Sequence, residues 1–441
     1  MIGVGVKDPL SGTQAQVEPD GALRVREQAP NLIDTNNATG DAFGRLRISA
    51  PVTLFDNKQL YDDQPLFWDD QEVSGAGTTS VHSTARASTT MGVSAATAGR
   101  RVRQTYQRFN YQPGKSQLVF MTGVLDKEGI GGDGITRRMG LYDDNNGFIL
   151  QKQDTTVSFV LRSASSGTPF DTVVSRNVWN LDTFDGDGPS GIGLDFTKTQ
   201  ILVLDFEWLG VGRVRMGFNV NGVTIYAHEF NHGNELDVVY LSDPNLPLRL
   251  EIENDGTGGA AEIEHICATV ITEGGQQRIA SGRYISQQTE GGGPVNANTA
   301  GVIYAIAGIR LKSTHLGTSV SVTNITMLGQ ASDDYEWLVI LNPTIAGTAP
   351  TWNGLTNSAV EAAIGDAVGN PSVNTVTLGT ILRGGLATAG NIAGFAFDQD
   401  IALASRIGSA IDGTPDEMWL CARALTANAD IEGGINFRED Q

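Results

Sequence analysis

Two histidines and a glutamate lie close together at residues 228–232, where the chain reads His-Glu-Phe-Asn-His. This spacing matches the H-E-x-x-H pattern of zinc proteases, in which both imidazoles bind one metal ion and the glutamate acts as a general base. The pattern requires a helix, because on a helix two residues four positions apart share a face. Glu251 and Glu253 are candidate third ligands. The structure around His228 and His232 therefore decides whether they form a zinc site.

The residues before this motif predict strands rather than a helix. Asn221-Gly222 lies between two alternating, β-branched runs at 213–220 and 223–227. Asn-Gly in this context is the strongest local signal for a β-hairpin, since a type I′ turn needs positive φ at both residues. On a strand, His228 and His232 would lie roughly 13 Å apart, too far for one zinc ion. We therefore predict no zinc site, and a zinc hydrolase stays an alternative.

An acidic, glycine-rich loop occupies residues 181–188 and contains Asp182, Asp185 and Asp187. Closely spaced carboxylates resemble a calcium loop, because Ca²⁺ takes six to eight oxygen ligands. The twelve-position calcium pattern ending in glutamate is absent, and Asp-Gly is common turn chemistry. The sequence favours a solvated turn, with calcium binding at Asp185 and Asp187 as the alternative.

Signatures of other catalytic sites are missing. The chain has no G-x-S-x-G nucleophile elbow, no phosphate-binding loop and no dinucleotide fingerprint. A pair of carboxylates for glycosidase chemistry stays open, because such a pair comes together only in the folded protein. We therefore predict that the protein is not an enzyme, and that it needs no cofactor.

A cluster of arginines stands out against the acidic background of the chain. Arg100, Arg101, Arg103 and Arg108 lie in a stretch that also contains tyrosines and a phenylalanine. Arginine and aromatic residues together are typical of protein interfaces. We interpret the cluster as a contact with an acidic neighbouring subunit, with a solvated strand face as an equal alternative and nucleic acid as the third.

Composition places the chain among all-β proteins that do not bind nucleic acid. The 441 residues carry a formal net charge of -20 and include 54 glycines. Such a charge repels DNA and RNA, since nucleic-acid affinity comes largely from neutralised phosphates. Short apolar stretches separated by turn residues predict antiparallel β-sandwich or jelly-roll domains.

The chain shows no sign of export or membrane insertion. We find no basic and apolar leader, and no apolar run near 18 residues. Cys267 and Cys421 lie in apolar strands, which favours buried free thiols over a disulfide. We expect a soluble protein made in a cytoplasm.

The chain divides into three parts. Residues 1–45 are polar and broken by prolines, which predicts an extended arm that becomes ordered on a neighbouring molecule, or a disordered tail. Residues 46–288 predict a large β-sandwich domain of jelly-roll or lectin-like type, and residues 289–441 a second β domain that begins with a glycine-rich linker. One short helix is expected at 357–364.

Several stretches resemble a poorly characterised family of structural proteins from the virions of tailed bacteriophages. These stretches are residues 41–49, 54–56, 111–116, 208–215, 228–232, 245–249, 341–343 and 437–438. The resemblance implies a non-enzymatic virion component, and it makes the histidine motif part of a structural pattern. It does not distinguish the head, the collar and the tail as the location.

Together these observations predict a structural protein on the outer surface of a phage particle, in contact with other virion proteins. We expect a homotrimer that attaches through its N-terminal arm. The main alternative is an adhesin that binds a receptor or a host-surface glycan. Its contacts would come from exposed aromatic rings at Tyr142, Trp179 or Trp352, which otherwise belong to the core.

Overall fold

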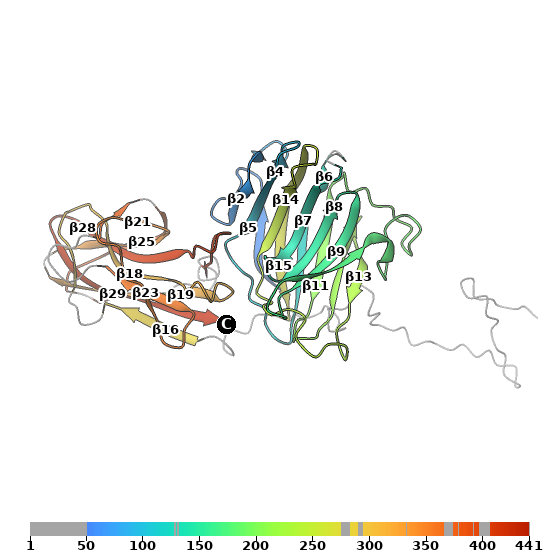
Figure 1. Ribbon diagram of the computed structural model, residues 1–441. Coiled ribbons are helices and arrows are strands. Elements are labelled where there is room, and N and C mark those ends of the chain that lie inside the picture. The colour runs from blue at the N-terminus through green and yellow to red at the C-terminus, as the bar shows by residue number, and fades with distance from the viewer. Residues whose placement is uncertain are drawn as a thin grey trace, which may run out of the picture.

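The protein consists of two antiparallel β-sandwiches that lie side by side (Figure 1). The computed structural model describes residues 51–440 apart from 128, 130–131, 275–282, 290–293, 332, 366–373, 378, 391 and 397–405. Every strand pairing among these residues is antiparallel. The predicted all-β sandwich class is confirmed. The predicted N-terminal arm, residues 1–45, lies outside the described residues.

One sheet of the first sandwich has eight strands. Its order is β13 (Val223–Phe230), β12 (Val214–Val220), β11 (Gln200–Phe206), β6 (Ser116–Lys127), β15 (Ala261–Glu273), β4 (Ser88–Val93) and β3 (Thr78–Ser83), with β1 (Val52–Lys58) also paired to β15. Asn221 and Gly222 have φ values of 54° and 83° and join β12 to β13. The predicted hairpin before the histidine motif is confirmed.

The facing sheet of the first sandwich has seven strands. Its order is β10 (Phe170–Ser175), β9 (Thr156–Ser163), β8 (Gly147–Gln153), β7 (Ile135–Tyr142), β14 (Leu248–Asn254), β5 (Gly99–Thr105) and β2 (Trp68–Gly75). Alternate side chains of both sheets point inward, as the period of a strand requires. Leu204, Met121, Leu250 and Phe148 are among those that form the continuous apolar core between the sheets.

The second sandwich is built from two six-stranded sheets and a short two-stranded one. One sheet contains β16 (Arg283–Gln288), β29 (Ala429–Asp440), β19 (Ser319–Ala331), β26 (Ile392–Ala396), β17 (Val295–Ala297) and β27 (Arg406–Ile407). The other contains β22 (Asn353–Gly354), β23 (Val360–Ile364), β18 (Tyr304–Leu311), β28 (Glu417–Ala424), β20 (Tyr335–Leu341) and β25 (Thr380–Ala387). A separate apolar core fills this sandwich, and β21 (Thr344–Ile345) pairs with β24 (Val376–Thr377) beside it.

Two predictions about the second domain are wrong. Its first strand, β16, pairs with β29, so the domain begins before residue 289 and the boundary lies between Gly274 and Arg283. The helix expected at 357–364 is the strand β23, which pairs with β18. Pairing with a central strand outweighs the helix propensity of the alanines in this segment. In the described part of the chain, no helix is long and apolar enough to span a membrane.

A buried carboxylate organises the outer face of the seven-stranded sheet. Glu251, on β14, is fully buried and forms ion pairs with Arg100 (2.9 Å), Arg138 and Arg249 (3.2 Å) from β5, β7 and β14. Burial alone would raise the pKa of Glu251, but the hydrogen bond from Arg100 and the charges of the arginines together lower it to about 2. The ionised carboxylate therefore links three adjacent strands.

Replacement of Glu251 by glutamine should destabilise the first sandwich by about 3 kcal/mol, because three arginines would lose a buried counter-charge. Urea denaturation followed by circular dichroism measures this change. Because the folded-state pKa of Glu251 lies below its ordinary value of 4.5, its contribution is present above that pH and is lost as the pH falls toward 2. The unfolding free energy of Glu251→Gln should therefore not show this loss as the pH falls.

Glu253→Gln is the matched control, since Glu253 has a side-chain exposure of 42% and lies 3.7 Å from Arg138. Its unfolding free energy should stay within about 0.5 kcal/mol of the native value. Equal losses in both variants would contradict the role assigned to Glu251.

Candidate functional site

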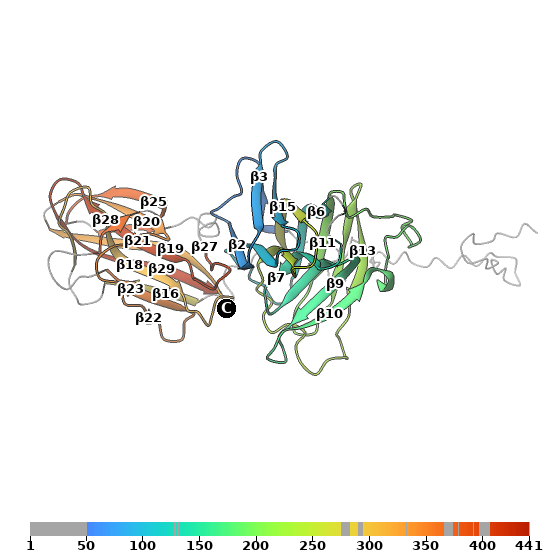
Figure 2. The same cartoon turned by 45° about the horizontal axis from the view of Figure 1, so that its top comes forward.

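An open cleft of about 450 Å³ lies at one edge of the first sandwich. It is formed by β9 and β10 at the edge of one sheet, by the end of β13 at the edge of the other, and by the segment that follows β13. Both views place these strands on the side of the first sandwich that faces away from the second (Figures 1 and 2). We call this feature the edge cleft.

The lining of the edge cleft combines apolar side chains with polar groups, one of which is a carboxylate. The apolar side chains are Leu161, Phe170, Phe230, Leu236, Val238 and Val239. The polar ones are Ser163, Ser165, Thr172, Glu229, Asn231, His232 and Tyr240. The ring of Phe170, at the first position of β10, is 69% exposed, which is unusual for a large aromatic residue.

The wall of the cleft after β13 is held by hydrogen bonds to the turn between β11 and β12. The Tyr240 hydroxyl donates to the carbonyl oxygen of Glu207 (2.6 Å), and the Tyr240 N–H donates to the carbonyl oxygen of Gly210 (2.9 Å). Gly210 has a φ of 81° and lies against Val239. The apolar side chains of Leu236, Val238 and Val239 therefore stay at the mouth of the cleft.

His232 is a neutral aromatic wall of the cleft. Its ring stacks on Tyr240 with 4.3 Å between centroids and 8° between planes. Its Nδ1 lies 2.7 Å from the carbonyl oxygen of Gly212. Because a carbonyl oxygen only accepts hydrogen bonds, this Nδ1 must carry a proton. Burial lowers the pKa of His232, so the ring is uncharged at neutral pH with an unprotonated Nε2.

His228 has the opposite tautomer. Its Nδ1 accepts a hydrogen bond from the N–H of Asn180 (3.2 Å), so the proton of the neutral ring lies on Nε2. Burial lowers the pKa of His228 to about 4, and its ring packs edge-on against Phe230. No group of three or more potential metal ligands occurs among the described residues, Glu251 and Glu253 included. Both imidazoles are therefore fixed by a hydrogen bond between Nδ1 and the backbone, and the absence of a zinc site stays a prediction.

Glu229 and Asn231 form the polar rim of the cleft. The amide of Asn231 donates to Glu229 Oε1 (3.0 Å), and Arg213 lies 3.6 Å from the carboxylate. The side chain of Asn231 is exposed at the end of β13. The rim thus presents an amide and a carboxylate beside the hydroxyls of Ser163 and Thr172.

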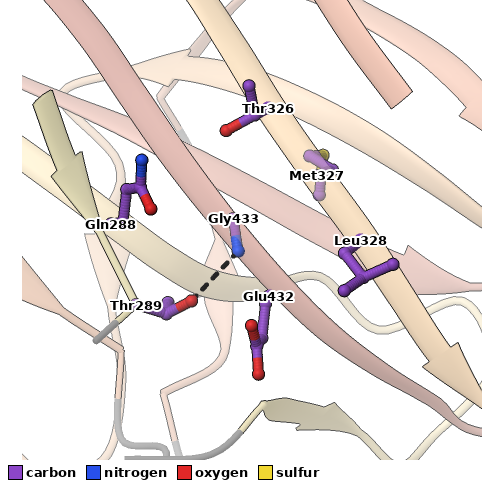
Figure 3. A pocket seen from close by; sticks show the side chains of 7 residues that line it. All are labelled: Gln288, Thr289, Thr326, Met327, Leu328, Glu432 and Gly433. Atoms are coloured by element: carbon purple, nitrogen blue, oxygen red, sulfur yellow. Dashed lines mark hydrogen bonds between the residues drawn. The ribbon is translucent and has the colours of Figure 1, made fainter. Parts of the chain in front are cut away.

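A second, smaller hollow of about 170 Å³ lies on the second sandwich (Figure 3). Its lining includes Gln288, Thr289, Thr326 and Glu432, and the Thr289 hydroxyl accepts a hydrogen bond from the N–H of Gly433 (3.2 Å). No aromatic ring contributes to it. This hollow offers hydrogen-bonding groups but no aromatic surface on which a ligand could stack. The edge cleft offers both and is therefore the better candidate for a binding site.

The acidic loop uses its carboxylates to hold its own backbone. Asp182 is buried and accepts hydrogen bonds from the N–H groups of Phe184 (2.8 Å) and Ser190 (2.7 Å). Asp185 accepts from the Thr183 hydroxyl (2.7 Å) and from the N–H of Asp187 (3.0 Å). These contacts agree with the predicted turn, and they leave calcium binding without a cage of converging oxygens.

The arginine cluster finds acidic partners within the same chain. Ion pairs join Arg100 to Glu251 and Asp144, Arg101 to Asp70, Arg103 to Asp70, and Arg108 to Asp143. Arg103 is 1% exposed and lies over the Trp68 ring, so its predicted place at an interface is wrong. The interface role of the other three stays a prediction.

The aromatic residues predicted to carry adhesin contacts are mostly internal. Trp179 is buried and stacks on Phe159 at 4.3 Å, and Tyr142 is fully buried. Trp352 is half-buried between Trp419 and the guanidinium of Arg310. The exposed ring that borders the edge cleft, Phe170, was missed. Its one signal is its position directly after a Gly-Thr-Pro turn at the start of an edge strand.

The free cysteines were predicted correctly. Cys421 is buried and Cys267 is partly buried, and neither forms a disulfide. Burial raises the pKa of the Cys421 thiol well above its ordinary value, so this group is unreactive at neutral pH.

No protein-family model and no curated protein matches the chain. Solved structures that are similar to it include an endo-1,3-beta-glucanase from Streptomyces sioyaensis (11% identity, TM-score 0.31), a legume lectin-like domain from Entamoeba histolytica (9%, 0.30) and the CBM2 module of the evolved Dit of Lactobacillus casei BL23 phage J-1 (8%, 0.32). The matches cover 51%, 50% and 52% of this chain and 97%, 97% and 98% of those chains, respectively. At these identities and TM-scores they carry no argument about function, which rests on the chain's own residues.

Addition of zinc or of a chelator should leave the melting temperature of the protein unchanged. A metal that bound the folded state would raise it, because ligand binding stabilises the state that binds. Differential scanning calorimetry with zinc and with EDTA checks this. A zinc-dependent rise that His228→Ala and His232→Ala both abolish, and that the exposed control His315→Ala retains, would contradict our interpretation of the motif.

Proposed function

We propose that the protein binds carbohydrate through the edge cleft. The observation that carries this proposal is the exposed ring of Phe170 beside the hydroxyls of Ser163 and Thr172 and the amide of Asn231. A pyranose has one face of C–H groups that packs on an aromatic ring, and a rim of hydroxyls that exchange hydrogen bonds with such groups.

The size of the cleft supports a small glycan segment. Ligand-binding clefts typically enclose about 300 to 1,000 Å³, with mostly apolar walls and a few placed polar groups. The edge cleft encloses about 450 Å³ and has this composition. Its open side leaves room for a longer chain to continue past the bound units.

The cleft is suited to binding and not to hydrolysis. Glycosidases use two carboxyl groups on opposite sides of the scissile bond, whereas Glu229 is the one carboxylate among the residues that line this cleft. Both nearby histidines have lowered pKa values, and each Nδ1 is engaged with the backbone. We therefore propose a binding protein that leaves its glycan intact.

Phe170→Ala should weaken glycan binding by roughly tenfold, because the stacking surface is lost. The native protein is first applied to an array of bacterial surface polysaccharides, and the best ligand is then titrated by calorimetry. Tyr284→Ala is the matched control, since the Tyr284 ring is also 69% exposed but lies on β16 of the second sandwich.

The control variant should bind as the native protein does. Absence of saturable binding across the array would refute the carbohydrate proposal. Equal affinity in the native protein and in Phe170→Ala would exclude the edge cleft as the place of binding.

We further propose that this binding protein is a component of a phage virion. Support comes from the sequence stretches that resemble the virion family, residues 41–49 and 208–215 among them. In this proposal the protein forms a homotrimer on the outside of the particle. Its residues 1–45 attach it to other virion proteins, and the edge cleft faces the host surface.

Deletion of residues 1–45 should abolish attachment to phage particles and leave a folded trimer, because the described residues, which begin at 51, form an apolar core in each sandwich. Co-sedimentation with particles that lack the protein measures attachment, and native mass spectrometry counts the subunits. Co-sedimentation of the truncated protein would disprove the anchoring role, and a native monomer would disprove the trimer.

A further inference from the structure

The two sandwiches are held together by a turn that extends from the second one, residues 408–416. The N–H of Ile411 donates to Asp69 Oδ2 on β2 (2.7 Å), and the N–H of Ser409 donates to the carbonyl oxygen of Tyr106 (3.1 Å). A Cβ at Gly408 would lie 2.0 Å from that same oxygen, so only glycine allows this approach. The contact is on the side of β2 and β5, which both views place toward the second sandwich (Figures 1 and 2).

An enclosed pocket of about 120 Å³ lies beside this contact, and we call it the junction pocket. Both sandwiches contribute to it. Its walls include Phe55, Phe67 and Tyr106 from the first sandwich and Leu341, Leu382 and Arg406 from the second. The pocket is therefore apolar on most sides and has one cationic group.

Within the described part of the chain the Arg406 guanidinium forms no direct ion pair, although the negative charge of Asp440 acts on it. Its Nε and Nη1 are buried, and they have no hydrogen-bond partner among the described residues. Other buried arginines in the described chain have a carboxylate, as Arg103 does in Asp70 and Arg137 in Asp126, both at 3.1 Å. Arg406 as a residue is half-buried, but buried N–H donors without a partner are costly, so its Nε and Nη1 are suited to bind an anion.

Carboxylates near Arg406 are engaged elsewhere. Asp416 also lines the pocket, but its oxygens accept hydrogen bonds from the Asn342 amide (2.8 Å) and the N–H of Gly408 (3.0 Å). Asp440 pairs with Arg438 at 2.8 Å. Burial raises the pKa of Asp416, whereas the hydrogen bonds from Asn342 and Gly408 lower it.

We propose that the junction pocket binds a small organic carboxylate with a compact apolar body. The carboxylate would pair with the guanidinium of Arg406, which presents parallel N–H donors that match its two oxygens. The apolar body would pack against Phe55 and Phe67. An apolar cavity of about 150 Å³ accommodates benzene, so the junction pocket takes a body of about four carbons.

Binding at this place would also link the two sandwiches, because the ligand contacts walls from both. A ligand that binds only the docked arrangement stabilises it. The N–H groups of Ser409 and Ile411, which donate across the junction, report on this arrangement directly.

The test uses isobutyrate, with isobutyramide as its uncharged isostere. Titration of the full-length protein by calorimetry should show saturable binding of isobutyrate and at least tenfold weaker binding of isobutyramide. Hydrogen exchange at Ser409 and Ile411 should slow when isobutyrate is bound. Absence of isobutyrate binding, or equal binding of the two compounds, would overturn the proposal whatever the variants do.

Arg406→Gln should abolish isobutyrate binding without lowering the melting temperature, because it removes buried N–H donors that have no partner among the described residues. Arg423→Gln, whose guanidinium pairs with Glu336 in the same sandwich, is the control and should bind normally. Unchanged affinity in folded Arg406→Gln would overturn the role of Arg406. The result is independent of glycan binding, which occurs at the opposite edge of the first sandwich.

Discussion

The structure depends on the alternation of its strands, which sends every second side chain into the space between two sheets. This arrangement buries the inner faces completely, but a flat sandwich leaves its edges open. At one edge of the first sandwich, β10 and β13 leave the edge cleft between them. At the other edge, β2 accepts the turn at 408–416 from the second sandwich. Both proposed binding places thus lie where the sandwich does not close by itself.

Charge is the second constraint, because a chain with a net charge of -20 must still bury several arginines. Each of the buried arginines Arg103, Arg137, Arg215 and Arg249 pairs with a carboxylate. Register places Asp70 beside Arg103 and Asp205 beside Arg215 on neighbouring strands, whereas Arg137 reaches Asp126 on the facing sheet and Arg249 pairs with Glu251 on its own strand. Arg406 differs from these four because it forms no direct ion pair within the described part of the chain, and its buried Nε and Nη1 point to a missing partner.

Local sequence rules predicted what depends on neighbouring residues. Asn221-Gly222 was identified as a hairpin because positive φ at both positions is a property of the residues themselves. The strand that follows carries His228 and ends at Phe230, before His232, and the Nδ1 atom of each imidazole is engaged with the backbone. The helix expected at 357–364 failed because pairing with β18 decides the structure there, and the domain boundary was misplaced because the partner of β16 is β29, at the far end of the chain.

The sequence by itself determined the all-β class, the sandwich architecture, the free cysteines and the hairpin that ends in the histidine motif. Alternating hydrophobicity and turn residues are local patterns, and composition is a property of the whole chain, so all three can be obtained from the sequence without the fold. Only the tertiary structure decided that the exposed ring of Phe170 lies beside Asn231 and His232, and that Arg406 faces Phe55 across the junction. These neighbours are distant in the sequence, and strand order and domain docking bring them together. A local sequence pattern does not determine which sheet edges come together in the folded protein.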